Sequence, residues 1–311
     1  MVVDPVPSDL PESPHGRHPS LSLVVTATQG CRHGATVIAE LRRQARAVDE
    51  LLIIELDACT APVDDRTAIE RHLDSGGVSE DRMRLLGLEQ SRGDVVVIFE
   101  DHGVPEPRML NAIRDLFDTH PQLEACTFFL RNGTQDDVAS RALFAFVGGF
   151  ADADAGIAVP RPVCSSFAVR RSTWQRAWAG APGGELRPGS LEYDLVPRLA
   201  NKGLVVLPTD LTITHFQRNT VREAVSAVFW NARIAGSVEA HIRPAKGRLW
   251  FTAKRYVVRV PLLNQIRRRP MLDNAALWAC AVAGFTGWWI GGWVGPGDAD
   301  AHLRAAHPVG A

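Results

Sequence analysis

Short apolar runs alternate with amphipathic stretches through the first third of the chain. The apolar runs are rich in Val, Ile and Leu and cover residues 21–27, 50–58 and 94–100. Runs of this length and composition predict strands that are buried on both faces, as in parallel sheets. The stretches between them have apolar residues at helical spacing and cover residues 34–48, 66–73 and 82–91. Strands that alternate with helices predict an α/β fold with a largely parallel sheet.

The pattern continues less regularly in the middle of the chain. We expect helices at residues 107–120, 190–203 and 218–235, and strands at 123–130 and 163–171, with two short strands within 204–215. Residues 132–163 contain several Gly, Asp and Ala without a clear period, which favours loops over a site.

The last apolar stretch differs from the others in length. Residues 275–295 contain no charged side chain, and a helix needs roughly 20 apolar residues to cross a bilayer. Gly287, Gly291 and Gly295 repeat every four residues, a spacing that lets a second helix approach closely in a membrane. A basic segment precedes this run, so residues 241–311 are expected to form a basic and apolar helical tail that associates with a membrane as a peripheral helix or a single span. A buried or surface helix packed on the rest of the protein is the alternative.

Composition and charge restrict the class of protein. The chain has 311 residues, of which 46% are hydrophobic, and 34 basic against 35 acidic residues give a net charge of -1. This balance gives no general attraction to nucleic acid. Five widely spaced cysteines without a CxxC pair argue against a disulfide framework and a structural zinc, and favour a reducing cytoplasm. Residues 1–20 are rich in Pro, Ser and charge, which predicts a disordered leader rather than a signal peptide.

Two acids and a histidine follow the third predicted strand directly. Glu100, Asp101 and His102 stand where residues 94–100 end. Parallel sheets present functional groups just beyond the carboxyl ends of their strands, so these three potential ligands predict a cation site. A solvated polar turn is the other interpretation. The sequence contains no GxGxxG, Walker, HExxH or GxSxG motif, which excludes the common signatures of dinucleotide, P-loop, zinc-protease and serine-elbow chemistry.

The order of these segments over residues 21–236 resembles that of the family-two inverting glycosyltransferases with the A-type (GT-A) fold. The motifs that carry the resemblance are the triplet with its following VPEP, Arg84 with Gly87 and Gly93-Asp94 upstream of it, and CSSFAVRRSTW. A further match is a segment with Glu, Leu, Leu, Gly, Pro and His at Glu192, Leu195, Leu199, Gly203, Pro208 and His215. The resemblance implies a GT-A-like, Rossmann-type mixed sheet flanked by helices over residues 21–240, followed by the C-terminal apolar helical tail.

The resemblance also implies roles for residues at the strand ends. Glu100 and Asp101 would serve the nucleotide and the metal, and His102 would ligate the metal. Because imidazole suits Mn²⁺ better than Mg²⁺, Mn²⁺ is the first expectation and Mg²⁺ the second. His215 is expected either to reach the metal or the leaving phosphate or to be a simple polar strand end.

Donor and acceptor contacts are implied at other positions. Thr26 would lie beside the base, and Glu55 or Asp57 would accept hydrogen bonds from the base or ribose. Arg84 would meet the diphosphate, unless it is solvated or salt-bridged. Arg170 and Arg171 would bind an anionic acceptor or simply flank their strand.

Inversion at a sugar carbon needs a general base, for which a carboxylate is the usual choice. Glu192 is the candidate and Asp194 the alternative. The family more often has a Glu-Asp pair where this chain has Leu191 and Glu192, and a helix N-terminal glutamate favoured by the helix dipole is the competing interpretation of Glu192.

Together these features predict a metal-dependent inverting glycosyltransferase that uses a nucleotide-diphosphate sugar. A glycan or lipid-linked acceptor and a position at the cytoplasmic face of a membrane would suit the apolar tail, with a purely cytoplasmic location as the alternative. The rival from another class is a catalytically silent relative that acts as a binding or scaffold protein in envelope assembly. Nucleotidyl transfer is disfavoured because no Gly-rich, Lys- or Arg-bearing loop follows the first strand.

Overall fold

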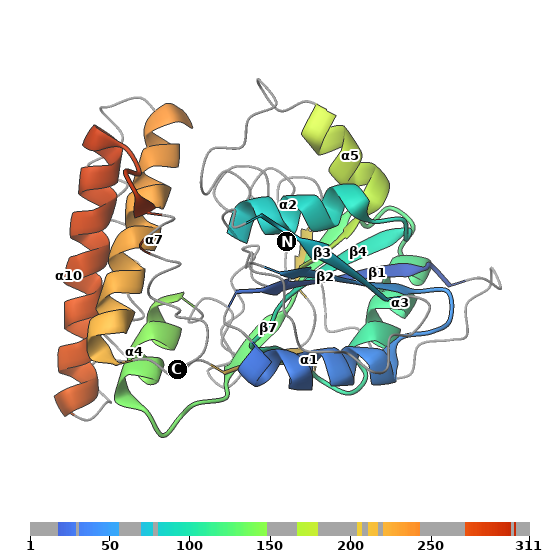
Figure 1. The fold of residues 1–311 in the computed structure, drawn as a ribbon, viewed down its shortest axis with the longest axis horizontal. Helices are drawn as coiled ribbons and strands as arrows, with labels where there is room; N and C mark the ends of the chain where they lie inside the picture. Colours follow the sequence, from blue (N-terminus) through green and yellow to red (C-terminus); the bar gives the residue numbers. More distant parts are fainter. Residues whose placement is uncertain are drawn as a thin grey trace.

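A mixed β-sheet with helices on both faces forms the larger part of the molecule, and a group of three helices lies beside it (Figure 1). The computed structural model describes residues 18–28, 31–55, 70–76, 80–147, 167–179, 204–206, 211–216, 220–242, 271–299 and 302. This arrangement agrees with the expected α/β class and with an apolar C-terminal helix.

The main sheet has seven strands in the order β3-β2-β1-β4-β8-β6-β9. Their bounds are β1 Leu21–Ala27, β2 Glu50–Glu55, β3 Glu70–Asp74, β4 Val95–Glu100, β6 Ala125–Thr127, β8 Phe167–Arg170 and β9 Leu204–Val206. Strands β3, β2, β1 and β4 are mutually parallel, whereas β8 runs antiparallel to both of its neighbours. The parallel half therefore carries the ends of β1, β2 and β4 to one edge of the sheet.

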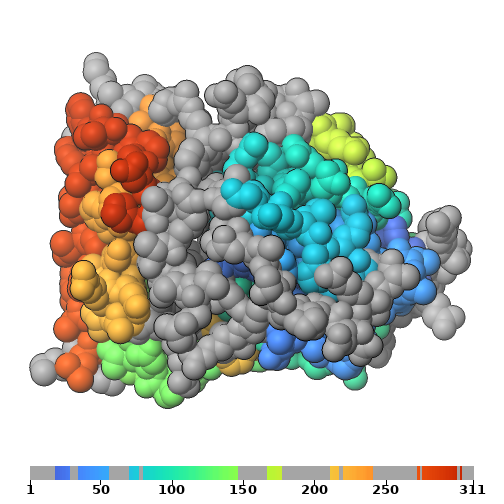
Figure 2. Space-filling model, in the orientation of Figure 1, coloured from blue at the N-terminus to red at the C-terminus, as the bar shows by residue number. Residues whose placement is uncertain are grey.

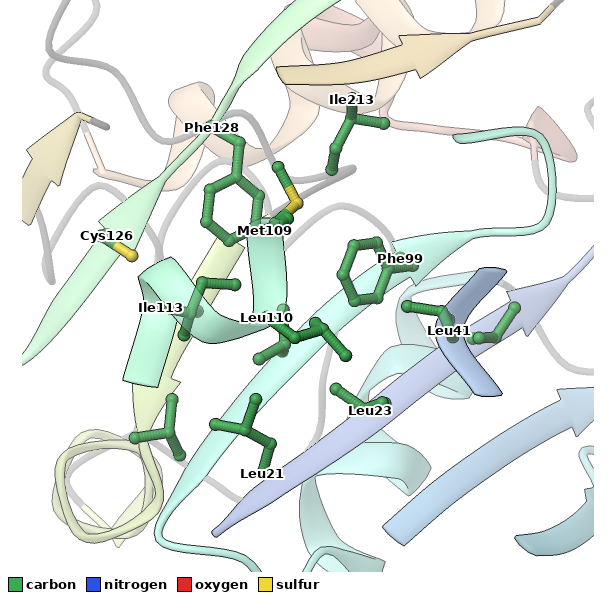
Figure 3. Packing of buried hydrophobic residues seen from close by; sticks show 14 of the residues in the cluster. Leu21, Leu23, Leu41, Phe99, Met109, Leu110, Ile113, Cys126, Phe128 and Ile213 are labelled. Atoms are coloured by element: carbon green, nitrogen blue, oxygen red, sulfur yellow. The ribbon is translucent and has the colours of Figure 1, made fainter. Parts of the chain in front are cut away.

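Two hydrophobic clusters cover the two faces of this sheet. On one face, α1 (Cys31–Gln44) and α3 (Met109–Thr119) pack on β1, β2 and β4, and Phe99, Met109 and Phe128 lie within that cluster (Figure 3). On the other face, α2 (Glu80–Gln90) and α5 (Arg171–Ala179) supply the buried residues. Alternate residues of β1 and β4 enter different clusters, which is the two-residue period of a strand buried on both sides.

Close backbone approaches explain the two glycines in the motif upstream of the triplet. A Cβ on Gly87 would overlap the Val24 side chain, so α2 lies directly on β1. A Cβ on Gly93 would come within 2.7 Å of the Ser22 backbone nitrogen. Asp94 then accepts hydrogen bonds from the backbone nitrogen and hydroxyl of Ser20, at 3.0 and 2.9 Å. These residues fix where β4 enters the sheet beside β1.

A second, three-stranded sheet has the order β5-β10-β7. It consists of β5 (Gly103–Pro105), β10 (Thr212–His215) and β7 (Phe129–Asn132). Strand β10 pairs antiparallel with β5 and parallel with β7. Because β5 begins three residues after β4 ends, this small sheet continues from the functional edge of the main sheet.

Three helices form the group beside the sheets: α4 (Val138–Val147), α7 (Val221–Ile242) and α10 (Met271–Val294). Residues of α4, α7 and α10 share one hydrophobic cluster. Residues 275–294 form a helix long and apolar enough to cross a membrane, and 44% of its most apolar window is buried inside the protein. The same length and composition occur in membrane spans and in the core helices of soluble proteins.

The structure corrects two expectations for local structure. The segment around residues 66–73 was expected to be helical, but Glu70–Asp74 forms β3, parallel to β2. Its polar residues suit this position because β3 is the edge strand. Residues 132–163 were expected to be loops, but α4 forms there, with the Asp137 carboxylate accepting from the backbone nitrogens of Ala139 and Ser140 at its start.

The remaining expected strands and helices agree with the structure wherever it describes them. The segment 123–130 forms two strands, β6 and β7, rather than one. The expected leader at 1–20 lies outside the described residues except for 18–20, as do the helix at 190–203 and most of the tail before α10. The proposed boundaries at residues 20 and 240 remain predictions.

Replacement of Gly87 by Ala tests the close packing of α2 on β1. Alanine raises helix propensity by about 1 kcal/mol, but its Cβ overlaps buried Val24, and overpacking costs about 1–3 kcal/mol. We expect Gly87→Ala to lower the free energy of unfolding by up to about 2 kcal/mol, measured by urea denaturation. Gly34→Ala in α1 is the matched control, because its Cβ meets only ordinary contact at 3.7 Å. Equal stability of the two variants would contradict the packing argument.

Candidate metal and nucleotide site

The ends of β1, β2 and β4 place three of the predicted residues along one sheet edge. Thr26 pairs in register with Glu100, and Ala27 pairs with Glu55 on the other side of β1. Thr26 is fully buried, and its hydroxyl donates to the backbone carbonyl of Phe99 at 3.4 Å. Glu55 and Glu100 are thus separated by the width of β1 and belong to two different clusters of side chains.

Glu100, His102 and His215 converge at the end of β4. The Oε2 atom of Glu100 lies 3.2 Å from the Nε2 atom of His102 and 3.3 Å from the Nε2 atom of His215. The two imidazole rings are 4.3 Å apart and meet edge to face at 80°. One ligand atom from each of the three residues lies within 4.8 Å of the others. Two imidazole nitrogens and a carboxylate oxygen form a donor set suited to a divalent transition metal.

Asp101 lies behind His102 rather than among the converging atoms. Its Oδ1 atom is 2.9 Å from the Nδ1 atom of His102, and its side chain is 1% exposed. With Nδ1–H donating to this carboxylate, Nε2 is the ring nitrogen of His102 that faces Glu100, and it has a lone pair for a metal once the ring is neutral. A carboxylate in this position fixes the ring and its tautomer for metal binding, as outer carboxylates do at many metal sites.

The pairing of β5 with β10 brings His215 to this point. His215 is opposite Gly103 in the register, next to His102, and the backbone nitrogen of Phe216 donates to the carbonyl of His102 at 2.8 Å. A Cβ on Gly103 would come within 3.0 Å of the Ile213 side chain, so glycine favours the close approach. The triplet and His215 are therefore held by one backbone ladder although His102 and His215 are 113 positions apart in the sequence.

Arg84 of α2 is bound on the far side of Glu100. Its Nη2 atom lies 2.7 Å from Oε1 of Glu100 and 2.5 Å from Oε1 of Glu80, and Asp81 is 3.6 Å from Nη1. The side chain is 6% exposed. Arg84 thus occupies one carboxylate oxygen of Glu100 while the histidines face the other, in agreement with the salt-bridged alternative.

Burial and neighbouring charges set the protonation states of the cluster. Burial raises the pKa of Glu100, but His102, His215 and Arg84 outweigh it and hold that pKa well below its usual range. Burial lowers the pKa of His102, but the charges of Glu100 and Asp101 raise it to about 10. Burial and the charge of His102 lower the pKa of His215. The histidines therefore differ, with a proton on His102 balancing Glu100 in the absence of a cation.

Glu55 belongs to a second cluster on β2 and β3. Its Oε1 atom lies 2.9 Å from Nδ1 of His72, whose Nε2 lies 2.8 Å from Oε1 of Glu70. Arg42 of α1 makes two bonds of 2.8 Å to Glu70. His72 was not predicted as a contact of Glu55, because residues 66–73 were expected to form a helix. Alternation in ERHLD, with Glu70 and His72 on one face of a strand, was the available signal.

Arg170 and Arg171 donate hydrogen bonds to backbone carbonyls of neighbouring segments. Arg170 donates to the carbonyls of Leu123 and Phe117, each at 2.6 Å, and its guanidinium lies 5.1 Å from the centre of the Phe117 ring. Arg171 donates to the carbonyl of Gly93 at 3.0 Å. These contacts favour a structural role for both residues over acceptor binding.

Three predicted site residues cannot be placed. Asp57, Glu192 and Asp194 lie outside the described residues, so their roles stay predictions. A neighbour that the sequence did not reveal is Phe144 of α4, whose ring centre lies 6.5 Å from that of His215. The helix that carries it was expected to be a loop.

Comparison with solved structures identifies the fold. The structure is similar to the mannosyltransferase PcManGT from Pyrobaculum calidifontis in complex with GDP-Man and Mn²⁺, with a TM-score of 0.53 and 15% identity, covering 94% of this chain and 86% of that one. Glucosyl-3-phosphoglycerate synthase from Mycobacterium tuberculosis is less similar, with a TM-score of 0.45, 18% identity and coverage of 70% and 77%. No protein-family model matches the sequence, and no curated protein is significantly similar to it. The fold is GT-A-like, as expected from the order of the segments.

Removal of the Arg84 charge tests its partnership with Glu100. Arg84→Met leaves a buried carboxylate without its cationic partner on one side, and breaking a buried pair costs about 3–5 kcal/mol. We expect a corresponding loss in the free energy of unfolding by urea denaturation. Arg82→Met on the exposed face of the same helix is the matched control and should change stability by less than about 0.5 kcal/mol. Equal effects would show that the Arg84 contacts contribute nothing specific.

Proposed function

We propose that this protein is a metal-dependent glycosyltransferase that moves a sugar from a nucleotide-diphosphate donor. The observation that carries the proposal is the convergence of Glu100, His102 and His215 at the functional edge of a GT-A-like fold. The mannosyltransferase structure of the same fold contains GDP-Man and Mn²⁺, which supports both the donor class and the cation.

The three converging residues would hold Mn²⁺, or Mg²⁺ as the alternative, through Nε2 of each histidine and Oε2 of Glu100. When bound, the cation would stabilise the negative charge of the departing diphosphate. His102 would release the proton that its raised pKa retains in the absence of a cation. Asp101 would keep the His102 ring in the ligating orientation, and Arg84 would hold Glu100 from behind.

The nucleoside would lie along the neighbouring strand ends. Glu55 at the end of β2 would accept from the base or ribose, together with the unplaced Asp57. His72, which contacts Glu55 at 2.9 Å, would hold this carboxylate in position. The hydroxyl of Thr26 is bound to the Phe99 carbonyl, so it would not contact the donor directly. Thr26 would instead form part of the floor of the site, between the two acids.

We further propose that transfer inverts the anomeric carbon, with Glu192 as general base and Asp194 as the alternative. The acceptor oxygen would form a bond to the anomeric carbon as the bond from that carbon to the diphosphate oxygen breaks. The acceptor proton would pass to the carboxylate, and the nucleoside diphosphate would leave. The apolar C-terminal helix supports a lipid-linked or envelope-glycan acceptor at the cytoplasmic face of a membrane.

Titration calorimetry with Mn²⁺ tests the metal ligands. We expect His102→Ala and His215→Ala each to weaken Mn²⁺ binding by about tenfold or more, because each removes one ligand atom. Asp101→Asn should weaken it by about tenfold through loss of ring orientation. His18→Ala, outside the cluster, is the control and should bind as the unmodified protein does. The metal assignment fails if His102→Ala binds Mn²⁺ normally.

The donor is identified by thermal shift with UDP-, GDP- and dTDP-sugars, each with Mn²⁺, with Mg²⁺ or with chelator. Binding to the folded state must raise its stability, so one nucleotide class should raise the Tm in a cation-dependent way. Folded protein without any shift would contradict the proposed function. Donor binding without turnover over an acceptor panel would instead favour the catalytically silent relative.

The proposed base is tested by Glu192→Gln, with Asp194→Asn as its comparison. Loss of the base should lower kcat by about 10²-fold or more and leave donor affinity unchanged, since base catalysis contributes about 10²–10⁴-fold. NMR of the product gives the anomeric configuration independently. Full activity in both variants, or a product with retained configuration, would be incompatible with this base and with inversion.

A further inference from the structure

One face of α10 packs on α7 almost backbone to backbone. A Cβ on Gly287 or Gly291 would overlap the backbone carbonyl of Phe229 or Arg233 in α7, and a Cβ on Gly236 of α7 would overlap the carbonyl of Trp288. Both helices therefore depend on these small residues for their contact. Two of the three glycines whose spacing suggested a partner helix in a membrane, Gly287 and Gly291, meet that partner inside the same chain. Gly295 follows the end of α10 with a φ of 88° and has no atom within 4 Å of an added Cβ.

The start of α10 is also attached to α4. Arg141 makes two bonds of 2.7 Å to the carboxylate of Asp273, whose side chain is 4% exposed. Leu277 and Cys280 lie in the same buried cluster as Leu143 of α4. Protein thus covers one face of α10 along its whole length.

The opposite face of α10 is apolar, aromatic and exposed. Its large residues recur at intervals of three or four from Trp278 onward and are Leu272, Trp278, Val282, Phe285, Trp289 and Trp293, of which Trp289 is half-buried and the others are exposed. Trp278 is 50% exposed, Val282 62% and Trp293 72%. We call these six residues the outer face of α10, and the helix forms one edge of the molecule in Figure 2. Contiguous apolar surface of this kind marks an interaction site.

A bilayer span by α10 conflicts with its packing. If α10 crossed the membrane alone, it would lose the glycine contacts with α7 and the ion pair with Arg141. If α7 crossed with it, Arg233 and Glu239 would enter the hydrocarbon, at about 2.5–3.5 kcal/mol for each charge near the centre. Arg233 is tied within the helix pair, since it donates to the carbonyl of Gly295 at 3.0 Å.

The chemistry of the outer face and its flank favours lipid over a protein partner. Trp278, Trp289 and Trp293 carry the amphipathic rings that concentrate at membrane–water interfaces. Three consecutive arginines, residues 267–269, precede the helix start at Met271 by only two to four positions in the sequence. Each basic residue close to an anionic surface contributes about 1 kcal/mol of attraction.

We propose that the outer face of α10 lies in the interfacial layer of an anionic bilayer, with α7 and α4 on the side away from the lipid. The helix then rests in the plane of the membrane surface and does not cross it. This inference makes specific the membrane location in the proposed function and rests on it, but binding to lipid is measured without donor, acceptor or turnover.

Flotation of the full-length protein with vesicles tests the proposal. We expect it to float with vesicles of phosphatidylcholine and phosphatidylglycerol, and more weakly with phosphatidylcholine alone. The double variant Trp278→Gln and Trp293→Gln should lower partitioning by about tenfold or more, because two large apolar contacts are lost. Val48→Gln is the matched control, since Val48 is 68% exposed on another part of the protein and should not affect binding.

The depth of the α10 tryptophans in the bilayer distinguishes a helix on the membrane surface from a helix that spans the membrane. Tryptophan quenching should be strongest with bromine atoms near the lipid head groups, and alkaline carbonate should release the protein. Deep quenching with carbonate resistance would overturn the surface arrangement in favour of a span. Absence of flotation by folded protein, or unchanged flotation of the double variant, would overturn the lipid assignment.

A second copy of the chain is the competing occupant of the outer face. Sedimentation of the unmodified protein and the double variant without lipid distinguishes it, because a dimer lost in the variant would replace the lipid proposal. The donor thermal shift should be the same in the double variant as in the unmodified protein. A normal shift without lipid binding would therefore reject this inference and leave the proposed function intact.

Discussion

The antiparallel pairing of β5 with β10 is the constraint on which the candidate site depends. It sets His215 opposite Gly103 and next to His102, and it adds the bond from Phe216 to the His102 carbonyl. Without this ladder, the end of β4 would present two acids and one histidine with no ligand from the second half of the chain. Backbone hydrogen bonds tolerate little sliding, because a one-residue slip would turn His215 to the other side of the small sheet. The geometry of the cluster is therefore fixed by main-chain pairing before any side chain contributes.

The second requirement is that the buried charge of Glu100 is neutralised, and different residues at the sheet edge meet it from different sides. Glu100 is a buried carboxylate whose two oxygens face opposite partners, Arg84 on one side and the histidines on the other. An unpaired carboxylate at this depth would be costly. Arg84 is consequently bound to Glu100 and to acids of α2, so in the proposed function other groups would contact the donor diphosphate. Asp101 contacts His102 through Nδ1, so in the proposed site the triplet would supply one ligand, one orienting group and a second ligand.

The buried parallel strands and the strand-end triplet could be predicted from the sequence because both have short-range signals. Val- and Ile-rich runs bounded by turn residues mark β1 and β4, and strand ends in a parallel sheet share an edge. The motif with Gly87 and Gly93 was recognised as a pattern, and its physical reason is close packing of α2 and of the β4 entry on β1. Strand β3 was missed because an edge strand has polar residues that also suit a helix. The Glu55–His72 contact and the position of Phe144 depend on pairings between distant segments, which a local pattern does not contain.

The glycine spacing in α10 fits two arrangements, a close neighbouring helix in the same protein or a partner helix in a membrane. Small residues every four positions predict a close helix neighbour, and α7 is that neighbour, so the pattern carries no information about a bilayer span. What distinguishes α10 from a core helix is its other face, where Trp278 and Trp293 are exposed and Trp289 is half-buried. Helix α4 connects this surface to the candidate site, since Leu143 packs in the cluster with α10 while Phe144 lies 6.5 Å from the ring centre of His215. On the proposed orientation, α10 and α4 lie between the lipid and the proposed metal ligands, so an acceptor head group held at the membrane surface would need to extend past these two helices to meet the donor.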